Sequence, residues 1–267
     1  MLQSKLTFRH AARRAKLLFA VSQFSKGEIA RLYGVPAEHI AITYNGVDPQ
    51  RFRPGPDGAD AVRELGLEPG GYLLTVGRLE PRKNHETLIH AYAELGADAP
   101  PLVIVGQRDF SYDQIDRAVA AHGLQQRVRF LQKVGDQALP AVMRHALAFA
   151  YPAFAEGFGM PVAEAMASGV PVITSNTTSL PEVGGAAALY ADPNSSAELA
   201  AALRQVLGDA ALRERMRAQG LAQVRKFDWQ QSAQVLVHGV RRFFEPTRPA
   251  NAAPSPAACN SSSGPDR

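Results

Sequence analysis

The chain contains a single cysteine, Cys259, among its 267 residues, and this cysteine lies in the C-terminal tail. An internal disulfide framework and a metal site built from several thiolates are therefore both excluded. Long apolar runs are also missing, because the longest stretches, such as Ala146 to Tyr151, are far too short to cross a bilayer. The net charge of only +4 lacks the basic excess of a dedicated nucleic-acid binder, so we expect no nucleic-acid partner.

Acidic residues are absent from the first part of the chain, where Glu28 is the first one. Several basic residues in this segment recur at the spacing of one helix face: Lys5, Arg9, Arg13 and Lys16. A transit peptide and a surface helix attracted to anionic lipid both show this pattern. We favour a third interpretation, a solvated helix of a domain that begins upstream. The pattern leaves room for peripheral contact with a membrane face.

Several familiar catalytic motifs are missing too. There is no G-x-x-x-x-G-K-[ST], no G-x-G-x-x-G and no G-x-S-x-G. The histidines His85 and His90 are five residues apart, so they do not share a helix face as zinc-protease ligands do. No Asp-x-Asp pair occurs, which disfavours phosphate chemistry assisted by a divalent metal. We therefore predict no metal site and no cofactor.

Short apolar runs alternate with longer amphipathic stretches along most of the chain. Continuous apolar strands separated by helices predict an α/β fold, in which a Rossmann-like parallel sheet has helices on both faces. The predicted strands are Tyr72–Val76, Leu102–Val105, Val128–Leu131, Leu147–Tyr151, Val170–Thr174 and Ala187–Tyr190. The predicted helices are Asn84–Leu95, Asp113–His122, Asp136–His145, Met160–Ser168, Ala197–Leu207, Ala210–Lys226 and Trp229–Phe244.

The N-terminal part has its own strand–helix–strand pattern. Strands are predicted at Leu17–Ser22 and Ile40–Tyr44, and the helix between them begins near Ser25, whose spacing to Glu28 fits a capping box. The Pro/Gly-rich stretch from Pro49 to Gly58 is the best candidate for an interdomain hinge. We divide the chain into an N-terminal remnant (1–48), a central α/β domain (49–226), a final helix (227–245) and a disordered tail (246–267).

Ligands of such sheets bind at the carboxyl ends of the strands, so the strand-to-helix loops are the places to search. The loop after Tyr72–Val76 contains Gly77, which lets the backbone approach closely, and the cations Arg78 and Lys83. A planar guanidinium and a mobile ammonium together suit a diphosphate. Two cations in a loop are, however, often simply solvated.

A second loop runs from Glu156 through Gly157, Phe158 and Gly159 to the helix that carries Glu164. Its glycines would expose backbone N–H groups at a helix N-terminus, where the helix dipole favours an anion. Glu156 and Glu164 would flank the phosphates rather than touch them. Glu164 suits two ribose hydroxyls, although an exposed helix residue would look the same.

A third loop, from Ser175 to Glu182, is rich in hydroxyl and amide side chains. Those groups suit the completion of a phosphate or sugar pocket. A polar loop that only caps the following segment fits the same sequence.

Three strings of this sequence together carry a family resemblance. EGFGMPVAEAMASGVPVITSN from Glu156 resembles the E-x7-E signature of retaining nucleotide-sugar glycosyltransferases of the GT-B fold. VGRLEPRKNHETLI from Val76 and NGVD from Asn45 extend the likeness. The resemblance covers roughly residues 17 to 244 and is to the glycosyltransferase family 1, mannosyltransferase-like group. It implies that the central domain is the C-terminal, donor-binding half of a GT-B fold.

The resemblance also implies roles for individual residues. Catalytic roles would fall to Arg78 and Lys83, which would bind and stabilise the donor diphosphate as leaving group, and to Glu156, beside the donor sugar hydroxyls. Glu164 would hold the ribose. The remaining donor contacts would come from Gly77, Gly157, Phe158, Gly159, Ser179 and Leu180. The implied reaction retains the anomeric configuration by front-face attack and needs no metal.

One departure from the family pattern concerns the acceptor-binding N-terminal domain, of which Leu17–Tyr44 resembles only the last strand–helix–strand. We therefore weigh two functions. The first is a transferase that moves a sugar, mannose-like by preference, from a GDP- or UDP-sugar to a glycan or lipid-linked acceptor, with the acceptor domain encoded upstream or on a separate chain. The second is a truncated nucleotide-sugar-binding module without activity of its own. An epimerase-like enzyme that acts on the nucleotide sugar itself is a third, less favoured hypothesis. The expected location is the cytoplasm, at or near the inner membrane face.

Overall fold

The computed structural model describes residues 2–108 and 113–244. Its main feature is a six-stranded sheet in the order β5-β4-β3-β6-β7-β8, in which every pairing is parallel. The strands are β3 (Leu73–Val76), β4 (Leu102–Val105), β5 (Val128–Leu131), β6 (Ala148–Tyr151), β7 (Val172–Ser175) and β8 (Ala188–Ala191). The predicted α/β fold is confirmed, and the strand boundaries lie within two residues of the predicted ones.

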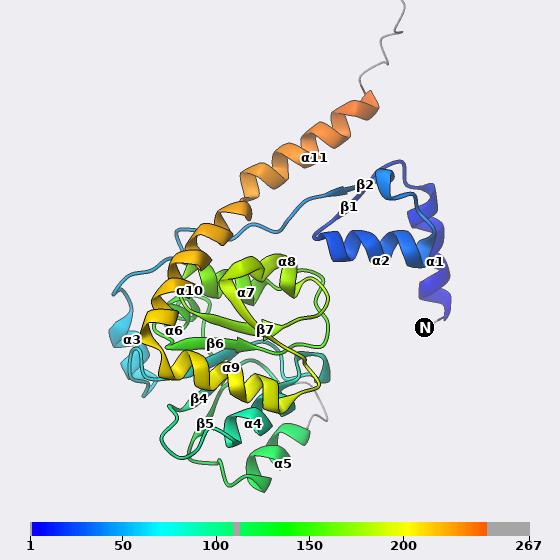
Figure 1. The fold of residues 1–267 in the computed structure, drawn as a ribbon. Helices are drawn as coiled ribbons and strands as arrows, with labels where there is room; N and C mark the ends of the chain where they lie inside the picture. Colours follow the sequence, from blue (N-terminus) through cyan, green and yellow to red (C-terminus); the bar gives the residue numbers. More distant parts are fainter. Residues whose placement is uncertain (1, 109–112, 245–267) are drawn as a thin grey trace, which may run out of the picture.

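Helices cover both faces of this sheet (Figure 1). One face packs against α4, α5 and α9, and the other against α3, α6, α7 and α8, each through its own cluster of fully buried side chains. Because both faces are covered, strands such as β4 and β6 are buried along their whole length, which explains their unbroken apolar sequences. The helices are α3 (Ala59–Glu64), α4 (His85–Ala93), α5 (Gln114–Ala121), α6 (Leu139–Arg144), α7 (Met160–Ala167), α8 (Leu180–Gly184), α9 (Ser196–Gly208) and α10 (Ala210–Gln223). The described residues also form four 3₁₀ turns: η1 (Ala37–His39), η2 (Pro81–Lys83), η3 (Gly185–Ala187) and η4 (Val224–Lys226).

The strand order reverses direction between β3 and β6. From β3 the chain moves outward to β4 and β5, then returns to pair β6 on the other side of β3 and continues to β7 and β8. Loops that leave two such neighbouring strands diverge to opposite faces of the sheet, which opens a crevice at their carboxyl ends. The strand order places this switch point between β3 and β6, and we use the word crevice for the place where the loops after these two strands meet.

The N-terminal unit is much smaller. Here α1 (Leu2–Arg14) and α2 (Gln23–Tyr33) accompany a parallel pair of strands, β1 (Leu18–Ala20) and β2 (Ile40–Ile42). The predicted strand–helix–strand is present, but our capping box at Ser25 is wrong. The N-cap is Ser22, whose hydroxyl accepts from the Ser25 N–H, so the helix begins one turn earlier.

The segment from Pro49 to Gly58, which we predicted as a hinge, is fastened to the six-stranded unit. Phe52 is buried in its core, and the guanidinium of Arg144 on α6 donates to the carbonyl oxygens of Arg51 and Asp57. The short helix α3 follows directly and was not predicted, because its six residues are too few to show a clear period.

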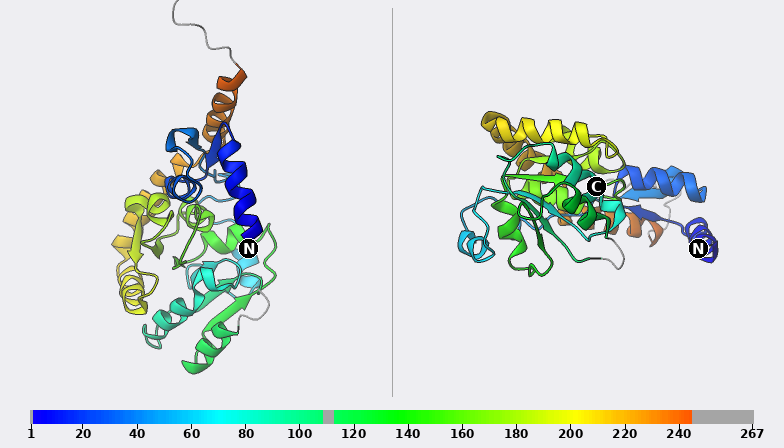
Figure 2. Two further views of the ribbon diagram at one scale, coloured as in Figure 1. Left: turned by 90° about the vertical axis from the view of Figure 1, so that its right-hand side faces the viewer. Right: turned by 90° about the horizontal axis from the view of Figure 1, so that it is seen from below.

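The last helix, α11 (Trp229–Phe244), leads away from the six-stranded unit and runs along the N-terminal strands (Figures 1 and 2). Gly239 lets it approach β1, since an added Cβ would meet Leu17 and Phe19 at about 3 Å. Several apolar side chains of this helix are nevertheless exposed: Val235, Leu236, Val237 and Val240. The tail that we predicted as disordered, 246–267, lies outside the described residues. Among the described helices none is long and apolar enough to cross a membrane.

Candidate functional site

The loop after β3 carries the two predicted cations. It ends in η2, and Asn84 follows in the left-handed region with φ of 59°. The buried Asn84 amide donates to the carbonyl oxygens of Pro152 and Pro193, which follow β6 and β8. This anchor fixes the turn and sets the direction of Lys83, while Arg78 is exposed earlier in the loop. The neighbouring Gly106 must be glycine, because an added Cβ there would meet the Gly77 oxygen at 1.9 Å.

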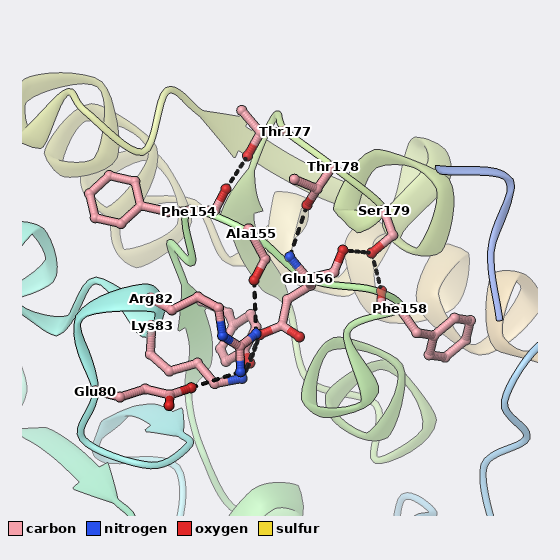
Figure 3. A network of polar contacts seen from close by, with 11 residues as sticks. Glu80, Arg82, Lys83, Phe154, Ala155, Glu156, Phe158, Thr177, Thr178 and Ser179 are labelled. Carbon is pink, nitrogen blue, oxygen red and sulfur yellow. Dashed lines mark hydrogen bonds and ion pairs between the residues drawn. The ribbon is translucent and has the colours of Figure 1, made fainter. Parts of the chain in front are cut away.

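Lys83 and Glu156 meet in the crevice between β3 and β6 (Figure 3). The Lys83 ammonium lies 2.5 Å from Glu156 Oε1, and their side chains are only 12% and 11% exposed. Tyr151, the last residue of β6, joins them: its hydroxyl accepts from Lys83 Nζ at 2.6 Å and donates to Glu156 Oε1 at 2.8 Å. Burial and the Glu156 carboxylate raise the pKa of Tyr151 far above its ordinary value, so its hydroxyl stays protonated.

Arg82 adds a second cation to this cluster. Its Nη1 donates to Glu156 Oε1 at 3.0 Å and to the Ala155 oxygen at 2.9 Å, while its Nη2 pairs with Glu80 at 2.7 Å. The pKa of Arg82 is raised, because the two carboxylates outweigh the opposing effect of partial burial. The sequence analysis assigned no role to Arg82 or Tyr151. The position of Tyr151 at the carboxyl end of a predicted strand was the available signal.

The loop that bears Glu156 is held by the loop after β7 (Figure 3). Thr178 accepts a hydrogen bond from the Glu156 N–H, and the Thr177 hydroxyl donates to the Phe154 oxygen. The buried Ser179 hydroxyl donates to the carbonyl oxygens of Glu156 and Phe158. The hydroxyls of the third loop therefore support the second loop. Ser179 and Leu180 are completely buried, backbone and side chain alike.

Helix α7 begins where the sequence predicts. Gly159 is its N-cap with φ of 104°, and Pro161 stands in the first turn, where its missing N–H costs nothing. A side chain at Gly159 would also meet Leu180 at 2.8 Å, so glycine is required there. The Phe158 ring packs against Tyr44 and Phe227, and the residue as a whole is buried.

Glu164 lies on α7, with Arg51 as the nearby charge that acts on it. Burial raises the pKa of Glu164, and the Arg51 charge opposes that shift. None of the described residues hydrogen-bonds to its carboxylate. The half-buried Glu164 carboxylate can therefore accept hydrogen bonds from two hydroxyl groups of a ligand.

The N-terminal unit touches the same loop. The hydroxyls of Ser22 and Ser25 both donate to the Gly157 oxygen, at 2.6 and 2.9 Å. Glu182 on α8 accepts from the Gln23 N–H at the start of α2 and from the Tyr44 hydroxyl. These polar contacts, none of which was predicted, join the two units at the mouth of the crevice.

The structure therefore brings Lys83 and Glu156 into direct contact and places Gly157, Gly159 and Glu164 on the loop and helix beside them. Among residues 2–108 and 113–244 no group of three or more histidine, cysteine, aspartate or glutamate side chains could hold a metal ion. The arrangement offers cations, backbone N–H groups and two carboxylates at one topological switch point, which is chemistry for an anionic ligand that also carries hydroxyl groups.

The family model for glycosyl transferases group 1 matches residues 61–223, more than half of the chain. The chain belongs to this family. A second model, glycosyltransferase family 4, matches residues 3–51 of this group 1 chain. The predicted resemblance is thus confirmed, and the matched ranges fall on the two structural units.

Curated relatives include an O-antigen chain mannosyltransferase B of Escherichia coli, which is 40% identical over 220 residues. That match covers 81% of this chain and 58% of the relative. A D-inositol 3-phosphate glycosyltransferase of Nocardia farcinica is 34% identical over 224 residues, with 79% and 49% of the two chains covered. The group 1 chain thus spans about half the length of these relatives.

Solved structures confirm the GT-B type of fold. The crystal structure of Anabaena HepE in complex with UDP and glucose superposes with a TM-score of 0.81 at 25% identity, covering 89% of this chain and 67% of that one. The C-terminal domain of a group 1 glycosyl transferase from Francisella tularensis has a TM-score of 0.60 and 24% identity, covering 68% of this chain and 97% of that domain.

Proposed function

We propose that this chain binds a nucleotide-sugar donor in the crevice between β3 and β6 and takes part in transfer of its sugar. The observation that carries the proposal is the Lys83–Glu156 pair, which sets a cation beside a carboxylate at the topological switch point. A donor diphosphate needs the cation, and sugar hydroxyls need the acceptor. The mannosyltransferase relatives and the UDP and glucose bound by HepE support this ligand class.

The donor would lie across the loops that meet at the crevice. Lys83 and Arg78 contact the diphosphate, the N–H groups of Gly157 and Gly159 supply further donors, and Glu164 accepts from the ribose hydroxyls. Glu156 accepts from hydroxyls of the sugar. GDP or UDP as the nucleotide, and a mannose-like sugar, remain the favoured choices from the family resemblance.

The proposed chemistry is a substitution at the anomeric carbon with retained configuration. The bond from that carbon to the diphosphate oxygen breaks, a bond to the acceptor oxygen forms on the same face, and the acceptor proton passes to the departing diphosphate. Negative charge grows on the leaving group, where the Lys83 ammonium is preorganised. Loss of one such contact typically lowers the rate by about 10²–10³-fold. The acceptor class is a glycan or a lipid-linked saccharide, and neither metal nor cofactor enters the scheme.

A donor-binding module without independent transfer is the second candidate. It is favoured by the small N-terminal unit, which has only two strands within the described residues, and by the exposed apolar side chains of α11. An acceptor-binding surface contributed by further chain, covalently joined or separate, would then be required for turnover.

Calorimetric titration with GDP, UDP and ADP tests the donor site. We expect saturable binding of one nucleotide and weaker binding to Glu164→Ala, because the ribose hydroxyls lose their acceptor. Glu214→Ala, which removes an exposed carboxylate on α10, is the matched control and should bind as the unaltered chain does. A folded chain that binds none of the three nucleotides contradicts the proposal.

Transfer is tested separately, with the matching nucleotide sugar and a saccharide acceptor. Formation of a product whose anomeric configuration equals that of the donor, measured by NMR, supports the transferase. Donor binding without any transfer, also after addition of a candidate acceptor-domain chain, supports the binding module. Equal affinity with and without EDTA is expected for the metal-free scheme.

A further inference from the structure

Four charged side chains form a cluster whose charges balance: Glu80, Arg82, Lys83 and Glu156. Glu156 and Glu80 contribute two negative charges, and Lys83 and Arg82 contribute two positive ones, all linked by contacts of 2.5 to 3.0 Å. An incoming diphosphate thus meets a cluster whose cations already have partners. Two of these side chains, Lys83 and Glu156, are almost nine-tenths buried, so solvent screens their pairing only weakly.

One oxygen of Glu156 receives all of the protein's donors. Oε1 accepts from Lys83, Tyr151 and Arg82, whereas no described residue donates to Oε2. A carboxylate oxygen has two lone pairs, so three donors on Oε1 more than fill it. This distribution holds the carboxylate by one edge and leaves the other edge for hydroxyl groups.

We propose that Glu156 is an internal competitor of the donor diphosphate, a role that rests on the proposed function of the site. When the donor binds, Lys83 and Arg82 turn from the carboxylate toward the diphosphate, and Glu156 takes sugar hydroxyls in their place. When the sugar has been transferred, those hydroxyls leave with it. Glu156 then recaptures the two cations, and the nucleoside diphosphate is released more readily.

Tyr151 makes this exchange feasible without moving Glu156. Its ring is buried and stacked on Phe149, and its protonated hydroxyl contacts both Lys83 and Glu156. As the cations turn away, the hydroxyl still donates to the carboxylate. Arg82 is suited to the mobile part, because its side chain is 47% exposed and keeps a second anchor on Glu80.

The competition has an unusual consequence for a residue placed in the site. Removal of the Glu156 charge should strengthen the binding of the nucleoside diphosphate product. It should also reduce the preference of the site for the nucleotide sugar over that product. In Glu156→Gln the amide keeps the size of the side chain but no longer repels the diphosphate or retains the cations. We expect the affinity for the nucleoside diphosphate to rise roughly tenfold, as for removal of one poorly screened like charge beside a bound anion. The nucleotide sugar, which loses a charged acceptor for its hydroxyls, should gain less or lose affinity.

The experiment is calorimetric titration of the nucleoside diphosphate that the unaltered chain binds, and of its nucleotide sugar, into four proteins. These are the unaltered chain, Glu156→Gln, Lys83→Ala and Glu80→Gln, each first checked for an unchanged circular dichroism spectrum and melting temperature. We expect tighter diphosphate binding for Glu156→Gln, weaker binding for Lys83→Ala, and a smaller gain for Glu80→Gln, which contacts Arg82 alone. Inorganic pyrophosphate, as a probe without base or ribose, should follow the same order.

The outcomes separate this inference from the proposed function. If the unaltered chain binds a nucleotide and Glu156→Gln binds it equally or more weakly, internal competition is overturned while the donor site stands. If Glu156→Gln is unstable, Arg82→Gln provides a second test. Loss of one exchanging cation should weaken diphosphate binding and make it depend less on salt concentration. An unchanged affinity would overturn the proposed exchange of cations between Glu156 and the diphosphate. If no protein binds any nucleotide, the donor site and the inference both fall.

Discussion

The six-stranded unit and the N-terminal unit differ in what they bury. In the first, helices cover both faces of the sheet, and two large clusters of fully buried side chains result. In the second, the residues whose burial is described give a buried cluster of Ala20, Val35 and Ile40, with partly buried side chains packed around it. Two strands and two helices cannot enclose a core of useful size, because too little apolar surface is removed from water to offset the loss of chain entropy.

The same difference shows in how the units are held together. The six-stranded unit depends on side-chain packing. The N-terminal unit rests against it through hydrogen bonds to Gly157 and Glu182 and through two partly buried side chains, Val21 and Tyr44, and it also contacts α11. A site between these units has one side formed by the rigidly packed six-stranded unit and another formed by the N-terminal unit, which is easier to move. Three experiments test this contrast.

The largest effect should come from the core of the six-stranded unit. Ile104→Ala in β4, at a fully buried position, should lower the free energy of unfolding by about 2–5 kcal/mol. Denaturant titration followed by circular dichroism measures this loss. Ile40→Ala in β2, also buried, is the matched substitution in the small unit. Ile40→Ala should speed amide hydrogen exchange over residues 18–42 and leave the main unfolding transition unchanged. A shift of that transition as large as the one caused by Ile104→Ala would show that both units unfold together.

Acid should destabilise the six-stranded unit through His85. Burial and the charge of Lys83 lower the pKa of His85 to about 4, from an ordinary 6.5. The folded protein resists this protonation, whereas the unfolded chain accepts it. The contribution of His85 to the free energy of unfolding is therefore complete above pH 6.5, and roughly 3 kcal/mol of it is lost as the pH falls toward 4. His85→Gln should remove that part of the pH dependence. Parallel curves of unfolding free energy against pH for the two proteins would refute the assignment.

The smallest effect should arise at the joint between the units. Glu182→Gln replaces a charged acceptor of the Gln23 N–H and the Tyr44 hydroxyl by a neutral one. The contacts are partly exposed, so we expect a loss of about 1 kcal/mol, confined to the docking of the N-terminal unit. Hydrogen exchange over residues 18–44 should become faster while that of β3 and β4 is unchanged. Glu214→Gln on α10 serves as the control. Equal hydrogen exchange in the two variants would contradict the role of Glu182 in holding the N-terminal unit against the six-stranded unit.

Much of the fold was predictable because local signals and tertiary packing agree. The continuous apolar runs of β4 and β6 and the glycine and proline around Gly159 place strands and a helix start correctly from the sequence. The failures have local causes. Helix α3 is too short to show a period, and at α2 two serines three residues apart offer competing caps, of which Ser22 is used.

The site shows the same division. Lys83 and Glu156 stand 73 residues apart in the chain, and their shared place could be inferred only from the expected strand order. Tyr151 and Arg82 carry no motif of their own. The place of Tyr151 at the carboxyl end of a predicted strand was a signal for it, whereas nothing in a single sequence separates Arg82 from a solvated arginine. Their contacts with Glu156 exist because β3 and β6 are neighbours.

Apolar periodicity and turn residues are enough to predict the class of fold, the order of the elements and the loops in which the chemistry lies. The tertiary structure alone decided which charges neutralise one another. Coulombic and hydrogen-bond energies depend on distances of a few ångströms between groups far apart in the chain, and only the parallel pairing of β3 with β6 sets those distances. It thereby made Glu156 the partner of Lys83 and Arg82, and gave this cluster its balanced charge.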